Sequence, residues 1–238
     1  MLYVRVNDIQ MYYEMHGDGE PLVVILGLGT DVSEWDGIIR WLAEKYKVLA
    51  FDNRGAGRTD KPDIPYSIEM MAEDTAGLMQ ALGMKQAHVL GISMGGRIAL
   101  TLALRHAPSV KKLVLVSTSA RIIKNWRRRF YGILSGAPIF RSKYPQPHYA
   151  FQRQLQASST FNCTDTLHEL HIPTLIMHGK KDKSVSYVLA EEMHAGIEGS
   201  KMLTFAGGHI FFLMRERQQF LDAIVEFVGT MNKAQGVL

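Results

Sequence analysis

Cysteine and long apolar runs are both scarce in this sequence. Cys163 is the single cysteine among 238 residues, so no disulfide can form within the chain, as is typical of a reducing compartment. The apolar run Leu22–Leu28 is far shorter than the roughly 20 residues that cross a bilayer. The first residues also lack the charged start and apolar core of a signal peptide. We therefore expect a cytoplasmic protein with no membrane partner.

Acidic residues are absent from one segment of the chain. Between Arg121 and Thr164 the sequence contains no Asp or Glu. The same segment holds eight basic residues, which are Arg121, Lys124, Arg127, Arg128, Arg129, Arg141, Lys143 and Arg153. The whole chain has a formal net charge of +4, so the rest of it is net negative. This distribution, and the lack of any zinc-finger, RNA-recognition or basic-zipper pattern, argue against a nucleic-acid partner.

Apolar runs of strand length alternate with helix-like segments along most of the chain. The predicted strands are Tyr3–Val6, Ile9–Met15, Leu22–Leu26, Val48–Asp52, His88–Gly91, Leu113–Ser117, Thr174–His178 and Met202–Phe205. The predicted helices are Trp35–Lys45, Ile68–Leu82, Gly95–His106, Tyr187–Ile197 and Arg215–Val228. The first two strands alternate apolar and polar residues, which predicts an antiparallel hairpin that turns at Asn7 and Asp8. The later strands are continuously apolar, so we predict an α/β fold with an eight-stranded, mostly parallel, doubly wound sheet.

The alternation of strands and helices fails only between Ser119 and Leu170. This stretch contains the basic residues described above, several aromatic residues, and three prolines, Pro138, Pro145 and Pro147. We interpret residues 120–170 as a short inserted helical lid. Residues 1–119 and 171–238 then form a single core domain, in which the sheet resumes after Ile172 and Pro173.

The segment Gly91-Ile92-Ser93-Met94-Gly95 matches the G-x-S-x-G pattern of a nucleophile elbow, a sharp turn between a strand and a helix. The spacing alone is a weak signal in a chain with 21 glycines, so the context has to support it. A predicted strand precedes the motif and a predicted helix follows it, which is the required context. Ser93 is therefore the candidate nucleophile.

A serine hydroxyl needs an imidazole to take its proton and a carboxylate to orient that imidazole. Asp182 follows one predicted strand and His209 follows the last one, and sites of open α/β sheets gather at such strand ends. The chain order Ser93, Asp182, His209 is the expected one. A turn acid flanked by lysines remains an alternative for Asp182. The other histidines lie in strands, helices or the lid and are expected to be structural: His16, His88, His106, His148, His168, His171, His178 and His194.

Acyl transfer also requires backbone amides that stabilise the developing oxyanion. Met94 follows the nucleophile and is the first candidate donor, and Leu28, in the glycine-rich loop after the third strand, is the second. A simple tight turn is the alternative for that loop. No metal site is expected, because His168 and His171 are three residues apart and not four as in H-E-x-x-H. No cofactor is expected either, because the sequence has neither a complete dinucleotide fingerprint nor a phosphate-binding loop.

The chain resembles the α/β-hydrolase superfamily from Gly17 to Val228, and within it the esterase and enol-lactonase-like members. Residues 51–60, with Thr59 where serine is usual, are similar to the D-x-R-G-x-G-x-S segment of that family. Residues 172–182 resemble the stretch that supplies the acid of the triad, and Gly207-Gly208-His209 resembles the one that supplies the base. The resemblance implies the fold and the triad Ser93, Asp182 and His209.

One departure from the family concerns the glycine-rich loop Leu26–Asp31, which we name the oxyanion loop because it carries the candidate donor Leu28. Many members have His-Gly ahead of the oxyanion residue, whereas this chain has Leu26-Gly27. The Leu-Gly-Thr-Asp that follows is similar to the corresponding sequence of enol-lactonases, which implies that lactones remain alternative substrates. Serine at position 93 argues against relatives with an aspartate nucleophile, such as haloalkane dehalogenases.

The leading functional prediction is a serine carboxylesterase that cleaves a small-molecule ester through an acyl-enzyme on Ser93. A lactonase, an acyl thioesterase or a carbon–carbon bond hydrolase remain alternatives with the same chemistry. A non-catalytic ligand-binding protein is an alternative from another class. In the lid, Trp126, Arg127, Arg128 and Arg129 are the candidate substrate-binding residues for an anionic group such as the phosphates of coenzyme A, the alternative being a solvated basic face.

Overall fold

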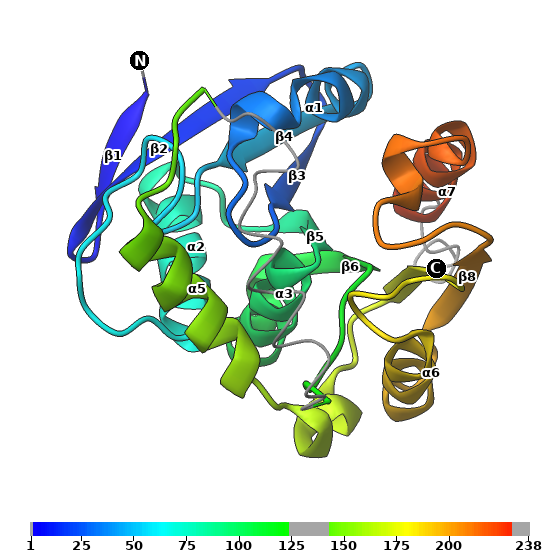
Figure 1. Cartoon of the computed structure of the whole chain (residues 1–238). Coiled ribbons are helices and arrows are strands. Elements are labelled where there is room, and N and C mark those ends of the chain that lie inside the picture. Colours follow the sequence, from blue (N-terminus) through cyan, green and yellow to red (C-terminus); the bar gives the residue numbers. More distant parts are fainter. Residues whose placement is uncertain (1, 124–142, 230–238) are drawn as a thin grey trace.

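A computed structural model describes residues 2–123 and 143–229. Its centre is an eight-stranded sheet with the order β1-β2-β4-β3-β5-β6-β7-β8 (Figure 1). The strands are β1 (Tyr3–Val6), β2 (Ile9–His16), β3 (Glu20–Ile25), β4 (Tyr46–Phe51), β5 (Ala87–Ile92), β6 (Val110–Val116), β7 (Thr174–Gly179) and β8 (Lys201–Phe205). Strand β2 runs antiparallel to both of its neighbours, and β3 to β8 are mutually parallel. The predicted mostly parallel sheet is therefore confirmed.

The hairpin at the start of the chain has the predicted turn. Val6 pairs with Ile9, which leaves Asn7 and Asp8 as the two loop residues. Asn7 has a φ of 50°, in the left-handed region that two-residue hairpin turns require and that asparagine tolerates. The largest difference from the predicted strand bounds is at β6, which begins at Val110 and not at Leu113. Lys111 and Lys112 interrupt its apolar run and hide its start in the sequence.

Helices cover both faces of the sheet because successive residues of a strand point to opposite faces. The helices are α1 (Asp36–Ala43), α2 (Ile68–Ala81), α3 (Met94–Arg105), α5 (His148–Thr160), α6 (Tyr187–Gly196) and α7 (Arg217–Gly229). One buried cluster joins alternate strand residues such as Val23 to α2, α3 and α6. A second cluster joins the intervening residues, such as Leu22, to α1 and α7. The result is the three-layer, doubly wound architecture that the sequence predicts (Figure 1).

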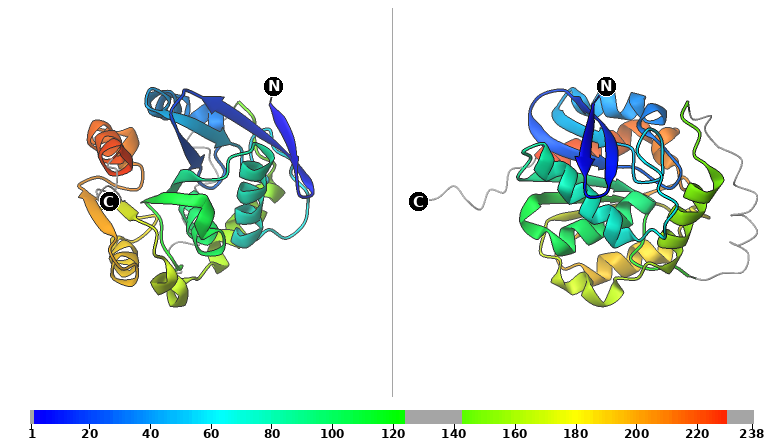
Figure 2. Two further views of the ribbon diagram at one scale, coloured as in Figure 1. Left: turned by 180° about the vertical axis from the view of Figure 1, so that it is seen from behind. Right: turned by 90° about the vertical axis from the view of Figure 1, so that its left-hand side faces the viewer.

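Helix α5 belongs to neither layer. It lies over the loops that follow β3 and β4 and is seen at the side of the molecule in the right-hand view of Figure 2. It falls within the insertion predicted for residues 120–170, and the boundaries of that insertion stay a prediction. Trp126, Arg127, Arg128 and Arg129 lie outside the described residues.

Two of the basic residues of this segment have acidic partners from other parts of the chain. Arg121 pairs with Glu192 of α6 at 2.6 Å, and Arg153 pairs with Asp63 at 3.0 Å. The positive charge of the segment is thus partly neutralised by the core. None of the helices in the described ranges is long and apolar enough to cross a membrane.

Candidate active site

The turn between β5 and α3 carries Ser93 in a strained conformation. Its φ of 56° and ψ of −115° lie outside the ordinary regions for a residue with a side chain. A Cβ atom at Gly95 would lie 2.1 Å from the carbonyl oxygen of Ile25, and one at Gly91 would lie 2.5 Å from that of Gly95. Both glycines of the motif are therefore needed for the turn to pack against β3 and the start of α3.

The carboxyl ends of β5, β7 and β8 bring the three predicted triad residues together. The hydroxyl of Ser93 lies 3.1 Å from Nε2 of His209. Nδ1 of the same imidazole lies 2.7 Å from Oδ2 of Asp182. In this arrangement the imidazole can accept the serine proton at Nε2 while Nδ1–H donates to the carboxylate, which is the geometry that nucleophilic catalysis by serine requires.

The carboxylate of Asp182 is fully buried and tightly held. Its Oδ1 accepts hydrogen bonds from the amides of Ser184 and Val185 at 2.7 and 2.8 Å. Burial raises the pKa of this carboxyl, but hydrogen bonds from His178 and His209 and from the Val185 amide outweigh it and hold the pKa well below its ordinary range. Asp182 is therefore ionised throughout the neutral range, as an imidazole-orienting acid must be.

A second histidine, His178, contacts the same carboxylate. Its side chain is fully buried at the end of β7, and its Nε2–H donates to the carbonyl of Val185 at 2.9 Å. The same nitrogen lies 3.3 Å from Oδ2 of Asp182. The sequence predicts only a structural role for His178. The sequence signal for this contact is the position of His178, which lies four residues before Asp182 on the strand that leads to it.

Two hydroxyl groups after β6 hold the backbone on either side of the catalytic contact. The hydroxyl of Ser117 donates to the carbonyl oxygen of His209 at 2.8 Å. The hydroxyl of Thr118 donates to the carbonyl oxygen of Ser93 at 2.7 Å. Both residues are fully buried, and Ser117 has a φ of 47°. Strand β6 lies beside β5 and two places from β8 in the sheet, and the residues after it contact the loops that carry Ser93 and His209, a relation that the linear sequence does not reveal.

The two candidate oxyanion donors lie on the segments that flank Ser93. Met94 is buried at the first position of α3. Leu28 follows Gly27, where a Cβ atom would lie 3.5 Å from the Cβ of Ser93. The loop after β3 is thus in contact with the nucleophile, and the donor roles of Leu28 and Met94 stay a prediction.

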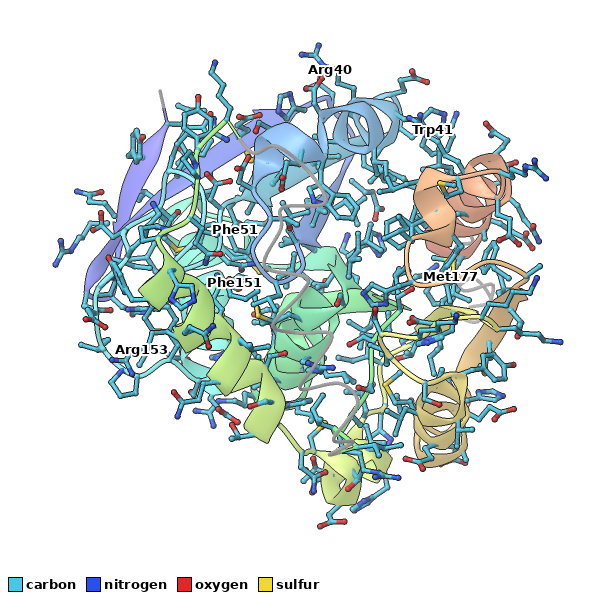
Figure 3. The ribbon with its side chains drawn as sticks, in the orientation of Figure 1. Arg40, Trp41, Phe51, Phe151, Arg153 and Met177 are labelled. Carbon is cyan, nitrogen blue, oxygen red and sulfur yellow. The ribbon has the colours of Figure 1, made fainter. Side chains whose placement is uncertain are left out.

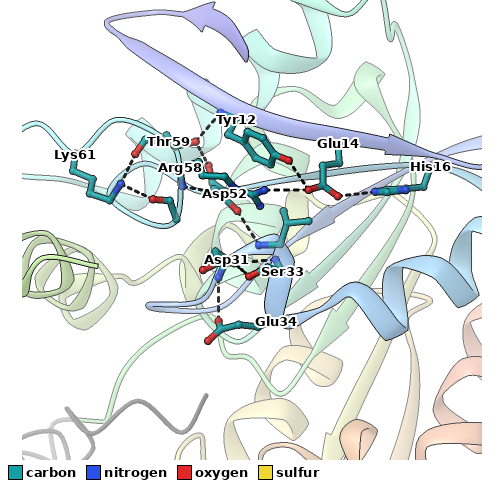
Figure 4. A network of polar contacts seen from close by, with 12 residues as sticks. Tyr12, Glu14, His16, Asp31, Ser33, Glu34, Asp52, Arg58, Thr59 and Lys61 are labelled. Carbon is teal, nitrogen blue, oxygen red and sulfur yellow. Dashed lines mark hydrogen bonds and ion pairs between the residues drawn. The ribbon is translucent and has the colours of Figure 1, made fainter. Parts of the chain in front are cut away.

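A buried network around Asp52 fixes the far side of this loop (Figure 4). Oδ1 of Asp52 accepts from the amide of Val32 at 2.8 Å, and Oδ2 accepts from the amide of Arg58 at 2.7 Å. Burial raises the pKa of Asp52, and these amides oppose that shift. Next to it, burial raises the pKa of Glu34 to about 7, although its carboxylate accepts from the amide of Asp31 at 3.1 Å. The network joins the loop after β3 to the loop after β4.

The side chains of the described residues form no metal-binding group. Across residues 2–123 and 143–229, no three or more His, Cys, Asp or Glu side chains come together in a way that could hold a metal ion. His168 and His171 lie in and just after a short 3₁₀ helix, Thr164–Glu169, before the amino end of β7, whereas Asp182 follows the carboxyl end of that strand. The groups that the structure brings together at the site are the serine hydroxyl, the imidazole and the carboxylate.

Comparisons with known proteins extend over nearly the whole chain. A family model described as alpha/beta hydrolase fold matches residues 20–170. RutD from Azorhizobium caulinodans, a proposed carbamate hydrolase, is 27% identical over 267 residues, covering 98% of this chain and 100% of RutD. The esterase EaEST from Exiguobacterium antarcticum is 26% identical with a TM-score of 0.83, covering 96% and 99% of the two chains. The enol-lactonase from Burkholderia xenovorans LB400 is 24% identical with a TM-score of 0.83, covering 96% and 100%, and thus shares the fold.

Proposed function

Since the chain belongs to the α/β-hydrolase family and is a hydrolase, we propose that it cleaves carboxylic esters through an acyl-enzyme on Ser93. One observation carries this proposal, the continuous contact from Ser93 through His209 to Asp182, with distances of 3.1 and 2.7 Å. A serine activated by such a histidine and carboxylate attacks a carbonyl carbon. We propose that this carbon belongs to a carboxylic ester.

In the proposed reaction, Oγ of Ser93 forms a bond to the ester carbonyl carbon while its proton passes to Nε2 of His209. The amides of Leu28 and Met94 stabilise the negative oxygen of the tetrahedral intermediate. Collapse of that intermediate breaks the bond to the alcohol, which takes the proton from His209. Water then repeats the sequence on the acyl-enzyme and releases the acid. Asp182 stays ionised and orients the imidazole throughout.

The similarity to the esterase EaEST supports an ester substrate. The similarity to RutD supports a second candidate, a carbamate, which offers the same serine a carbonyl carbon bearing nitrogen. Lactones, which are cyclic esters, react by the same steps and stay within the proposal, as do thioesters. The choice among these substrates depends on the shape of the pocket and not on the triad.

The proposal extends to the substrate-binding role of the lid. Trp126, Arg127, Arg128 and Arg129 supply an apolar surface and cationic groups for an anionic part of the substrate remote from the scissile bond, such as the phosphates of coenzyme A. The concentration of basic residues in this segment supports that role.

A hydrolysis panel tests the proposed function. Purified wild type and Ser93→Ala are compared on p-nitrophenyl esters, lactones, carbamates and acyl thioesters. We expect the highest kcat/KM of wild type on an ester and no activity of the variant above background. A higher kcat/KM on a carbamate than on any ester would support the second candidate function, carbamate hydrolysis. Turnover that persists in Ser93→Ala would overturn the serine mechanism.

A further inference from the structure

The loop after β3 is held by a side chain that lies 125 positions away in the sequence. Gln154 of α5 is fully buried, and its Oε1 accepts a hydrogen bond from the amide of Gly29 at 3.1 Å. Its Nε2 donates to the carbonyl of Arg54 at 2.7 Å. Oε1 also accepts from the side-chain amide of Gln146 at 3.0 Å. This one amide therefore links α5 to the loops that follow β3 and β4.

The contact to Gly29 matters because of the peptide unit to which that amide belongs. The N–H of Leu28 lies in the Gly27–Leu28 peptide plane, and the Leu28–Gly29 plane restrains it from the other side of the Leu28 Cα atom. The Leu28–Gly29 plane is held through its N–H by Gln154. The Gly27–Leu28 plane, which contains the N–H of Leu28, is held through its carbonyl by the hydroxyl of Thr30 at 3.2 Å. In a trans peptide that N–H points away from the carbonyl, so Thr30 and Gln154 together fix its direction.

The face of α5 that carries Gln154 makes two further contacts near the nucleophile. Gly29 has a φ of 72°, and a Cβ atom there would lie 3.1 Å from the ring of Phe151. Figure 3 shows Phe151 on the inner side of α5, with Arg153 on the opposite side. One turn beyond Gln154, Ser158 accepts hydrogen bonds from Arg97, which lies in the first turn of α3. Helix α5 thus contacts both segments that carry the candidate oxyanion donors.

We infer that Gln154 is a positioning residue of the oxyanion hole, which sets the direction of the Leu28 amide through the Leu28–Gly29 peptide. The inference rests on the proposed function, because the amide of Leu28 acts only on an acyl substrate attacked by Ser93. Oxyanion donors bind the tetrahedral intermediate more strongly than the planar ester. Loss of Gln154 therefore lowers kcat and the affinity for a tetrahedral analogue, and it leaves KM nearly unchanged.

The test uses Gln154→Met, which keeps the length of the side chain and removes its hydrogen bonds. We expect kcat on the best ester to fall by about tenfold to a hundredfold, somewhat less than the loss of an entire oxyanion donor. The affinity for a trifluoromethyl ketone, which forms a tetrahedral adduct with the serine, should fall by a similar factor. KM should change by less than about twofold.

Matched variants separate this role from a general loss of stability. Gln156→Met makes the same change at an exposed position of α5 and should leave both quantities unchanged. Thr30→Val removes the second anchor of Leu28 without touching α5 and should lower kcat and the ketone affinity together, whereas Thr30→Ser should restore them. This pair tests the positioning of the Leu28 amide, on which the inference depends, even if Gln154→Met does not fold.

The wild-type protein shows whether a negative result concerns the inference or the proposed function. If wild type forms no ketone adduct at Ser93, the proposed function fails. If wild type forms the adduct, and folded Gln154→Met and Thr30→Val both keep kcat and ketone affinity, the proposed function stands and the inference is overturned. A rise in KM at constant kcat would also overturn it, because Gln154 would then affect ground-state binding.

Discussion

The triad and the oxyanion loop meet at one edge of the sheet, but different parts of the chain hold them in place. The triad is fixed by the core, through His178 at the end of β7 and the hydroxyls of Ser117 and Thr118 after β6. The oxyanion loop is fixed partly by α5, through Gln154. In the proposed mechanism, proton transfer depends on the sheet, whereas stabilisation of the oxyanion depends also on a helix outside its layers.

The largest expected effect comes from removal of the base. His209→Ala should lower kcat by about 10⁴-fold to 10⁶-fold, because the triad acts as a unit. A residual rate above the uncatalysed reaction should remain, owing to the oxyanion hole. Adding Gln154→Met should lower that residual rate further. A loss of less than about tenfold in the single variant, measured on the best ester with folding checked by circular dichroism, would remove His209 from the mechanism.

A smaller effect is expected when the backbone of Ser93 loses its hydrogen bond to the core residue Thr118. Thr118→Val keeps the shape of the side chain and removes the hydroxyl that donates to the carbonyl of Ser93. We expect a fall in kcat of about fivefold to tenfold, the equivalent of one hydrogen bond, and recovery in Thr118→Ser. Thr75→Val is the matched control, because it removes a buried threonine hydroxyl that bonds Met71 in α2. If both valine variants lower kcat equally, the effect is one of general stability.

The lid should affect substrate binding more than chemistry. Replacing Arg127, Arg128 and Arg129 with glutamine should raise KM for an anionic ester several-fold and leave a neutral ester nearly unaffected. The dependence of kcat/KM on salt should weaken as well, because screening acts on the same charges. Initial rates on a matched pair of anionic and neutral esters measure this. Equal changes in KM for both esters would support the alternative that Arg127, Arg128 and Arg129 form only a solvated basic face.

The smallest expected effect concerns stability alone and the turn that follows the oxyanion loop. The pKa of Glu34 is raised by burial from 4.5 to about 7 in the folded protein. Between these values the folded state binds more protons than the unfolded state, so this residue lowers the free energy of unfolding as pH rises toward 7. Glu34→Gln should match wild type in urea midpoint at about pH 4.5 and exceed it at about pH 9. A lower urea midpoint for Glu34→Gln than for wild type at about pH 9 would contradict the raised pKa of Glu34.

The sequence predicts the triad geometry well because each member is tied to a local pattern. Ser93 lies in a motif between a strand and a helix, and Asp182 and His209 follow strands. In a sheet of parallel strands, the carboxyl ends share one edge, so placing a residue after a strand also places it near the others. The fold and the meeting of these three side chains follow from that rule.

The residues that hold the triad and the oxyanion loop in place cannot be predicted from the rule that strand ends share one edge. Their contacts join segments that are distant in the sequence and that no local motif connects. Gln154 is 125 positions from Gly29, and it lies in the segment where the alternation of strands and helices fails. The hydroxyls after β6 act through the order of strands in space, which the sequence order does not give. His178 resembles any buried strand histidine until the carboxylate of Asp182 is seen beside it.

Covalent labelling shows whether Ser93 is the nucleophile of a serine hydrolase. Wild type is treated with a serine-directed phosphonate ester, and the protein mass and the modified peptide are determined by mass spectrometry. We expect one adduct for each chain, on Ser93, with loss of hydrolysis in proportion to labelling and a greatly slowed reaction in His209→Ala. Full hydrolysis by the labelled protein, or an adduct on a residue other than Ser93, would contradict this role of Ser93.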